Sequence, residues 1–198
     1  MAIFSTSGNS VVWAGARWVA VGVSGGSGVI AISTTGSSAW SIIAAGNGGS
    51  SLSTAGYGVS WNGKTLVAVG DGSLNSISYS TNGGLNWTGA GKTIFSLIGY
   101  GIAWNGKQWM ATGTGSANSL AYSNDGINWF GLGKTIFNTA RGVASNSLVG
   151  ANKVDSQLVL SDKTNRLNNN NVLDVVADRY NNSGYSNMII GIESTDTE

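Results

Sequence analysis

The chain has 198 residues, of which 31 are glycine and only 10% are charged, and it contains no proline, cysteine or histidine. The net charge of +1 leaves no basic footprint for nucleic acid. The missing cysteine and histidine exclude disulfides, thiol nucleophiles and the usual transition-metal sites. Eight tryptophans and regular apolar alternation indicate a folded β protein with many tight turns rather than a disordered chain.

The charged residues are unevenly distributed along the chain. Residues 1–150 carry six basic and two acidic side chains, whereas residues 151–198 carry four basic and seven acidic ones. The opening stretch MAIFSTSGNS lacks a basic region followed by an apolar run, so we expect no signal peptide. No apolar stretch approaches the roughly 20 residues of a transmembrane helix, so we also expect no insertion into a membrane.

An internal repeat dominates the first two thirds of the chain. YGVSWNGKTLVAVG (57–70) returns 43 residues later as YGIAWNGKQWMATG (100–113), and GKTIF (91–95) returns at 133–137. A looser copy, SVVWAGARWVAVG, spans 10–22. A period of about 40–45 residues is typical of one four-stranded unit in a propeller or a similar array.

Each repeat is predicted to contain four strands. The first strand ends at a tryptophan, and in the second and third repeats Asn-Gly then supplies a tight hairpin turn. The second strand is apolar on both faces, which favours a sheet covered on both sides. The third strand is expected at 29–33, 76–80 and 119–123, and the fourth begins at Trp40, Trp87 and Trp129.

A turn rich in Ser, Asn and Gly links the third and fourth strands of each repeat. It reads STNGGLNW at 80–87, SNDGINW at 123–129 and STTGSSAW at 33–40. These stretches resemble the Ser-x-Asp-x-Gly-x-x-Trp pattern of the Asp-box, or BNR, repeat of sialidase-like β-propellers and of many microbial and viral surface proteins. The resemblance covers about residues 3–137. The copy at 123–129 is one residue short, and the copy at 33–40 keeps only Ser33, Trp40 and a displaced Gly36.

We interpret this turn as a structural staple. An Asp or Asn in a turn accepts hydrogen bonds from the backbone N–H groups that follow it, and glycine supplies the positive φ. The resemblance implies the same role, because the Asp-box ties strands three and four of a blade and is not a catalytic site. The predicted staple residues are Ser80, Asn82, Gly84, Trp87, Ser123, Asp125, Gly126 and Trp129.

The sequence offers no constellation of catalytic residues. A sialidase would need an arginine cluster, a carboxylic acid and an activated tyrosine, but Arg17 is the only arginine before residue 141. The acids of the repeats are Asp71 and Asp125, and they form no pair suited to glycoside hydrolysis. We therefore expect no enzymatic activity, no cofactor and no metal site.

The expected fold is all-β, with three four-stranded, propeller-blade-like units of about 42 residues and a C-terminal β tail. A three-sheet closure, as in a β-prism or β-trefoil, would also accommodate three units. The repeat region is expected at 1–142, with units at about 3–51, 52–93 and 94–135 and a partial fourth start at 136–142. The appendage at 143–198 is predicted to contain strands at 156–161, 171–178 and 187–192.

Three units fall short of the 4–8 or so blades of a closed propeller, so strand edges and one sheet face need a cover. The tail, a closure of the three sheets on one another, or another subunit could provide it. We predict a non-enzymatic structural subunit that assembles head-to-tail with copies of itself into a filament, ring or surface layer, outside a cell or on a virion. The predicted contact residues are Ile3, Phe4, Ile136, Phe137, Leu158, Leu160, Val175, Ile189 and Ile190.

The alternative function is glycan binding by an adhesion or receptor-binding module. Tryptophan and tyrosine edges beside Asn and Gly turns are common in sugar-binding proteins, and the candidates for stacking are Trp13, Trp18, Trp61, Trp104 and Trp109. Because large aromatic side chains more often fill β cores, packing is the favoured interpretation of these residues.

Overall fold

The computed structural model describes residues 2–25, 29–44, 47–48 and 51–145, and the backbone of two tail strands at 174–177 and 190–193. The chain divides into two compact units, Met1–Asn152 and Lys153–Glu198, and each is described by itself. The described residues form strands and turns and no α-helix, which confirms the all-β fold. Among them, no helix has the length and apolar character needed to cross a membrane.

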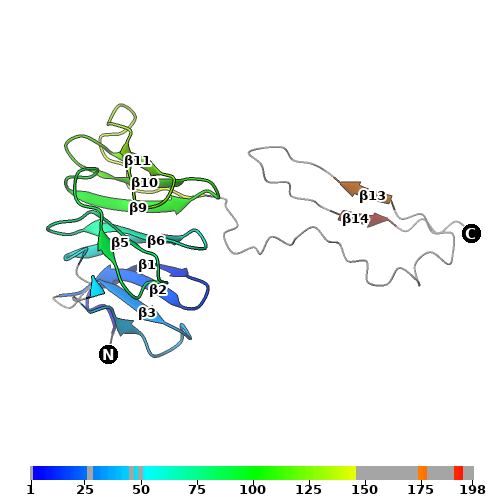
Figure 1. The fold of residues 1–198 in the computed structure, drawn as a ribbon, viewed down its shortest axis with the longest axis horizontal. Helices are drawn as coiled ribbons and strands as arrows, with labels where there is room; N and C mark the ends of the chain where they lie inside the picture. The colour runs from blue at the N-terminus through cyan, green and yellow to red at the C-terminus, as the bar shows by residue number, and fades with distance from the viewer. Residues whose placement is uncertain are drawn as a thin grey trace, which may run out of the picture. The chain divides into compact units, whose positions relative to one another are not determined.

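The first unit contains three successive four-stranded antiparallel arrays, one for each sequence repeat (Figure 1), and we call them blades 1, 2 and 3. Within each blade, each strand pairs with its neighbour in the chain. A single backbone pairing, Val23 with Ala55, joins blades 1 and 2 into one eight-stranded sheet, and blade 3 forms a separate four-stranded sheet. Blade 1 contains β1 (Ser7–Trp13), β2 (Trp18–Val23), β3 (Ile30–Ser33) and β4 (Ser41–Ile42). Blade 2 contains β5 (Ala55–Trp61), β6 (Leu66–Asp71), β7 (Ile77–Ser80) and β8 (Thr88–Gly89). Blade 3 contains β9 (Ile98–Trp104), β10 (Trp109–Thr114), β11 (Leu120–Ser123) and β12 (Phe130–Gly131).

In the second unit, β13 (Asp174–Ala177) pairs antiparallel with β14 (Ile190–Glu193). These strands overlap the ranges predicted at 171–178 and 187–192. The strand predicted at 156–161 lies outside the described residues.

The Asn-Gly turns form the hairpins between the first two strands of blades 2 and 3. Asn62 Oδ1 accepts hydrogen bonds from the backbone N–H groups of Lys64 and Thr65, at 2.9 and 2.7 Å. Asn105 Oδ1 accepts the equivalent bonds from Lys107 and Gln108, at 3.0 and 2.7 Å. An asparagine that bonds its own following backbone in this way fixes a tight turn and thereby sets the register of both strands.

The core lies between successive blades. On β6, Leu66 and Ala68 pack against blade 1 in a cluster that includes Val19 and Val21. The alternate residues Val67 and Val69 pack against blade 3. We call the side of a blade that meets its predecessor in the chain the preceding face, and the opposite side the following face. Blade 2 therefore buries both faces, as the apolar second strand predicts.

The first strand of each blade, β1, β5 or β9, is called its inner strand here. All three inner strands carry a β-bulge at the same place, which was not predicted from the sequence. The pairing with the next strand skips Asn9 in β1, Tyr57 in β5 and Tyr100 in β9. The bulged side chains bridge successive blades. Asn9 Nδ2 donates to the Gly56 carbonyl at 2.8 Å, and the rings of Tyr57 and Tyr100 lie 5.7 Å apart. A bulge re-aims a side chain, and here each one faces the adjoining inner strand.

Candidate functional site

The three repeated turns share one hydrogen-bonding scheme. In each, a serine Oγ accepts from a glycine N–H, and a tryptophan Nε1 donates to the carbonyl of that same glycine. The glycines have φ values of 75°, 88° and 79°, a conformation that side chains other than glycine rarely adopt. The residues are Ser33, Gly36 and Trp40 in blade 1, Ser80, Gly84 and Trp87 in blade 2, and Ser123, Gly126 and Trp129 in blade 3.

Gly36 therefore occupies the same place as Gly84 and Gly126, although its sequence spacing departs from the Asp-box pattern. Two residues separate the serine from the glycine in blades 1 and 3 and three in blade 2, whereas three residues separate the glycine from the tryptophan in blade 1 and two in blades 2 and 3. The turns therefore differ in spacing, yet the two hydrogen bonds at the glycine are the same in each.

The position of the motif's aspartate is filled differently in each blade. Asp125 Oδ1 accepts from the N–H groups of Ile127 and Asn128, both at 2.8 Å. Burial raises the pKa of Asp125, but hydrogen bonds from Asn128, Ile127 and Ser123 outweigh burial and lower this pKa to about 2. Asn82 Oδ1 accepts from Asn86 N at 3.0 Å, and Thr35 Oγ1 bonds the backbone of Ser38. A neutral acceptor thus performs the same task in blades 1 and 2.

In blades 2 and 3 the turn glycine also packs against the preceding blade. A Cβ at Gly84 would lie 3.0 Å from Val19 Cγ2 and 3.6 Å from Ile32 Cγ2, both in blade 1. A Cβ at Gly126 would lie 2.9 Å from Val67 Cγ2 in blade 2. At Gly36, by contrast, the three nearest heavy atoms all belong to Trp18 of the same blade. The staple of blade 1 therefore lacks the neighbour that the other two have.

The preceding face of blade 1 carries an aromatic pair that blade 3 repeats. Trp13 and Trp18 are cross-strand partners with ring centroids 5.3 Å apart and an interplanar angle of 60°. Trp104 and Trp109 are paired in the same way, at 5.2 Å and 54°. Trp109 is completely buried against blade 2, whereas Trp18 is half-buried and Trp13 is 42% exposed. Blade 1 thus presents to solvent a surface that is an interface elsewhere in the chain.

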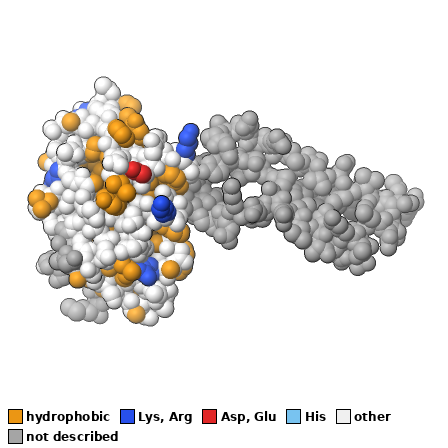
Figure 2. Space-filling model, viewed as in Figure 1, with side chains coloured by type: hydrophobic (Ala, Val, Ile, Leu, Met, Phe, Trp, Pro, Cys, Tyr) orange, Lys and Arg blue, Asp and Glu red, His pale blue; other side chains and the backbone are white. Residues whose placement is uncertain are grey.

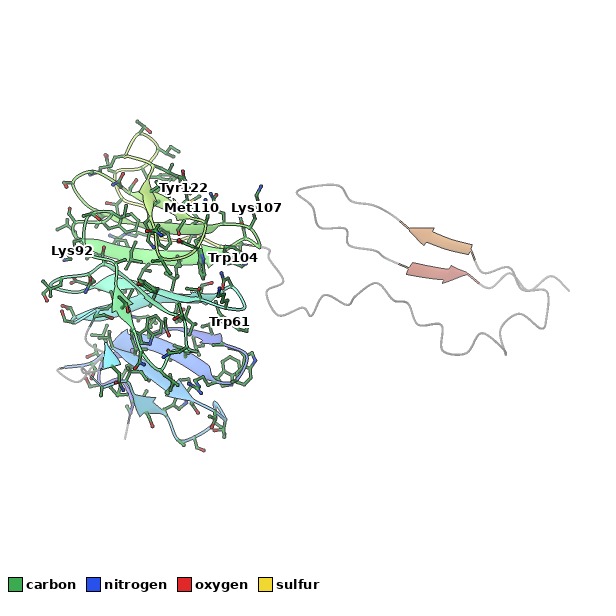
Figure 3. The ribbon with its side chains drawn as sticks, in the orientation of Figure 1. Trp61, Lys92, Trp104, Lys107, Met110 and Tyr122 are labelled. Carbon is green, nitrogen blue, oxygen red and sulfur yellow. The ribbon has the colours of Figure 1, made fainter. Side chains whose placement is uncertain are left out.

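The following face of blade 3 is also apolar and accessible. Met110 pairs with Tyr122, and Tyr122 pairs with Phe130, so the three side chains form a row across β10, β11 and β12. Figure 3 shows Met110 and Tyr122 close together on this blade. The Tyr122 and Phe130 rings stack at 5.3 Å, and Phe130 is 53% exposed. The equivalent residues Val19 and Ile32 on blade 1 receive Gly84 of blade 2.

The predicted contact residues at the ends of the repeat region have different surroundings. Ile136 is 68% exposed and Phe137 is 50% exposed. Ile3 and Phe4 are half-buried, and a Cβ at Gly22 would lie 2.7 Å from the Phe4 ring. Phe4 thus packs within blade 1 much as Phe95 packs on Gly113 in blade 3. Leu158, Leu160 and Ile189 lie outside the described residues, and Val175 and Ile190 belong to β13 and β14, of which only the backbone is described.

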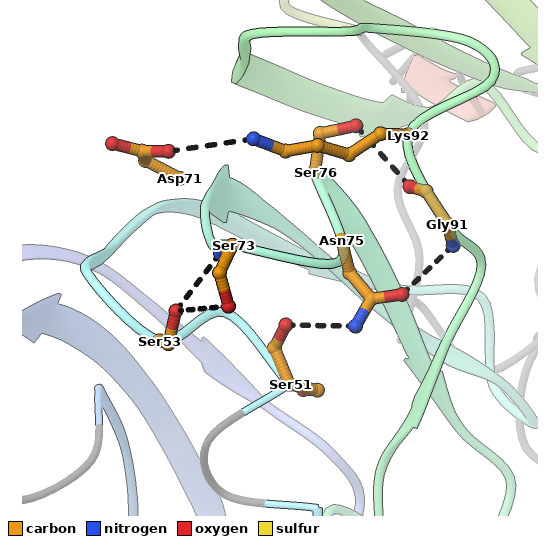
Figure 4. A network of polar contacts seen from close by, with 8 residues as sticks. All are labelled: Ser51, Ser53, Asp71, Ser73, Asn75, Ser76, Gly91 and Lys92. Carbon is orange, nitrogen blue, oxygen red and sulfur yellow. Dashed lines mark hydrogen bonds and ion pairs between the residues drawn. The ribbon is translucent and has the colours of Figure 1, made fainter.

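At the end of the blades opposite the Asn-Gly turns, polar side chains connect the loops and linkers in a hydrogen-bond network (Figure 4). Asn75 Nδ2 donates to the Ser51 carbonyl at 3.0 Å, and Asn75 Oδ1 accepts from Gly91 N at 2.8 Å. Asn118 makes the same two bonds in blade 3, to Ile94 and Gly133. Lys92 Nζ lies 3.9 Å from Asp71 Oδ1 beside this network. The repetition indicates that each asparagine fastens both the linker that enters its blade and the linker that leaves it.

The described surface carries few charged side chains. On the face drawn in Figure 2, hydrophobic side chains lie among scattered basic residues with little acidic surface. No group of three or more His, Cys, Asp or Glu that could hold a metal ion occurs among the described residues. Trp61 and Trp104, considered above for stacking, are half-buried against the clusters between blades. They lie at the same end of their blades as Lys107, away from Lys92 (Figure 3).

One solved structure supports the arrangement of the blades. The chain is similar to YCF48 from Cyanidioschyzon merolae, a β-propeller, with a TM-score of 0.51 and 18% identity over 69% of this chain and 43% of that chain. The fold is propeller-like. The chain spans less than half of YCF48, and at this identity the likeness shows the fold alone. No family model and no curated protein sequence matches the chain, so its likeness to the Asp-box repeat stays a resemblance.

Proposed function

We propose that the chain is a non-enzymatic structural subunit that assembles head-to-tail, with blade 1 of one copy packing on blade 3 of the next. The accessible Trp13–Trp18 pair carries this proposal, because in the equivalent pair of blade 3 Trp109 is completely buried against blade 2. An exposed apolar face of this kind is typical of an interaction surface.

The two end faces are complementary in the way that neighbouring blades are. Within the chain, a turn glycine and the tryptophan or leucine that starts the second strand pack on the following face of the blade before. Blade 1 offers Gly36 and Trp18 for this contact. Blade 3 offers the row Met110, Tyr122 and Phe130 in the place of Val67, Tyr79 and Thr88 of blade 2. The occupant of each end face is therefore a second copy of the chain.

A contact between unlike surfaces produces a ring when the rotation between copies closes and a filament when it does not. The rotation between successive blades is small enough in propellers to close after about 4–8 blades, which favours a ring or a short helical array. A location outside a cell or on a virion surface stays a prediction from the sequence.

Analytical ultracentrifugation over a range of protein concentrations tests the proposal. Wild-type protein should form oligomers, and Trp13→Arg should shift it to monomer because the charge would be buried in the contact. Leu74→Arg is the matched control, since Leu74 is 77% exposed and lies in a loop between β6 and β7. Wild-type protein that stays monomeric at every concentration would contradict the proposal.

A mixing experiment tests the head-to-tail geometry. Trp13→Arg disables only the blade 1 face, and Phe130→Asp disables only the blade 3 face. Each variant alone should be monomeric, and an equimolar mixture should yield heterodimers and nothing larger. If a single variant still formed dimers, the contact would join like faces and the head-to-tail arrangement would be wrong.

The exposed Trp13 also supports a second candidate, glycan binding, because an accessible indole beside another aromatic ring can stack on a sugar. Screening the wild-type protein and Trp13→Ala on a glycan array distinguishes the two functions. Binding that is lost in Trp13→Ala while the protein remains monomeric would favour the glycan module.

A further inference from the structure

Residues 139–145, which we call the strap, lie on blade 3 in the position of an inner strand of a fourth blade. Ala140 N donates to the Gly113 carbonyl at 3.1 Å, and the Arg141 guanidinium lies 5.0 Å from the centre of the Tyr100 ring. A Cβ at Gly101 would lie 3.1 Å from Val143 N. These contacts reproduce those of β9 on blade 2, where Tyr100 lies against Tyr57 and a Cβ at Gly58 would lie 3.4 Å from Ile102 N.

The strap nevertheless lacks the support that the three inner strands have. β1, β5 and β9 each pair with the following strand of their blade along their length, whereas the strap forms no strand and has no ladder partner among the described residues. Ala140 is its only buried side chain. Two side-chain bonds flank it: Thr114 Oγ1 to Thr139 Oγ1 at 3.2 Å, and Ser145 Oγ to the Trp104 carbonyl at 2.6 Å.

In the proposed assembly, the strap and strand β1 of an incoming copy would occupy the same position on blade 3. When a blade packs on its predecessor in this chain, its inner strand lies along the predecessor's first two strands, as β5 lies along β1 and β2. Blade 1 of an incoming copy would accordingly place β1 along β9 and β10, where the strap lies. The outer row of Met110, Tyr122 and Phe130 can accept the incoming blade, but the inner edge can hold only one strand.

We propose that the strap is a placeholder that β1 of the incoming copy displaces, so that release of the strap limits assembly. This inference rests on the proposed head-to-tail function and names the regulation of the same site. The exchange is favourable because the strap offers an isolated segment with few contacts, whereas β1 arrives already paired with β2 and carries Val11 and Trp13. The strap meanwhile shields the inner edge of blade 3 from incorrect strand pairing.

A reversible disulfide tests the displacement. Thr114 and Thr139 touch through their hydroxyl groups, and the chain contains no native cysteine, so Thr114→Cys with Thr139→Cys creates the only possible intramolecular bond. In sedimentation experiments the oxidised double variant should be monomeric, and the reduced form should assemble at least as well as wild type. Mass spectrometry of the oxidised protein verifies the bond.

A matched disulfide controls for the chemistry. Ser96 and Ser116 are in hydroxyl contact at 3.3 Å and neither belongs to the strap, so the oxidised Ser96→Cys with Ser116→Cys variant leaves the strap free and should assemble normally. If it also failed to assemble, the loss in the strap variant would not be due to the strap, and the inference would be overturned.

The remaining outcomes separate the two proposals. An oxidised strap variant that assembles as wild type does would overturn the placeholder and leave the head-to-tail function standing. A wild-type protein that never assembles would overturn both. As a second variant that needs no disulfide, Thr139→Ala removes one strap contact and should tighten association up to about fivefold, as expected for one lost hydrogen bond. Weaker association in Thr139→Ala would contradict the placeholder.

Discussion

Blades 1 and 3 contain the same tryptophan pair in two different environments. Trp13 and Trp18 have nearly the same ring separation and angle as Trp104 and Trp109. In blade 3, Trp109 belongs to the core between two blades and Trp104 packs against it, whereas in blade 1 Trp18 is half-buried and Trp13 is exposed. The geometry of the pair is thus a property of the hairpin that carries it, while its energetic role depends on whether another sheet lies against it.

The largest expected effect is the loss of folding stability when Trp109, the buried tryptophan of this comparison, is replaced. Trp109→Ala should lower the free energy of unfolding by about 3–5 kcal/mol, because it removes a fully buried indole and leaves a cavity. Trp18→Ala, at the equivalent position of blade 1, should cost no more than about half as much in the monomer. Urea unfolding followed by circular dichroism, at a concentration where the protein is monomeric, measures both. Equal losses would show that blade 1 is covered in solution.

A second comparison concerns the tryptophans of the repeated turns. Trp87 is buried, so Trp87→Ala should cost about 3–5 kcal/mol. Trp129 belongs to the last described blade and is only half-buried, so Trp129→Ala should cost about 2 kcal/mol. The same unfolding experiment decides the order. A larger loss at Trp129 would mean that the turn itself, and not the neighbouring blade, determines the cost.

A smaller effect is expected at the aspartate position of the turn. Asp125→Ala removes an acceptor that holds the N–H groups of Ile127 and Asn128, and should cost about 1 kcal/mol. Asp125→Asn should change stability by only a few tenths of a kcal/mol at neutral pH, since Asn82 already fills this place in blade 2. Loss of a ligand interaction in Asp125→Ala, without loss of stability, would show that the turn is a binding site.

The smallest effect is the pH dependence of this turn. The pKa of Asp125 is lowered from 3.8 to about 2 in the folded protein, so the carboxylate contributes stability that is present above about pH 4 and is lost as the pH falls towards 2. The stability difference between wild type and Asp125→Asn should therefore change in favour of the variant over this interval. Chemical unfolding at pH 6, 4 and 2.5 measures it, and a pH-independent difference would contradict the lowered pKa.

The sequence by itself determined most of the local structure. The Asn62 and Asn105 turns, the alternation of Leu66 and Val67 between two faces, and the repeat period all depend on interactions within about 40 residues. Side-chain periodicity and turn chemistry act at that range, so these features can be inferred without knowledge of what packs on them. The propeller-like fold was predictable for the same reason, since three similar units with two apolar faces must stack.

Only the tertiary structure decided which copies of a repeated residue are buried and which are exposed. Trp13 and Trp104 occupy the same place in their repeats, and the difference in their surroundings comes from the neighbouring sheet. The bulges at Asn9, Tyr57 and Tyr100 also escaped prediction, because a bulge depends on the register between two strands and not on one strand's composition. Likewise, Gly36 was too far from the motif's spacing to be assigned, yet the loop folds so that Ser33 Oγ accepts from its N–H. Hydrogen-bond geometry tolerates an inserted residue that a sequence pattern does not, and only the folded chain shows which contacts are kept.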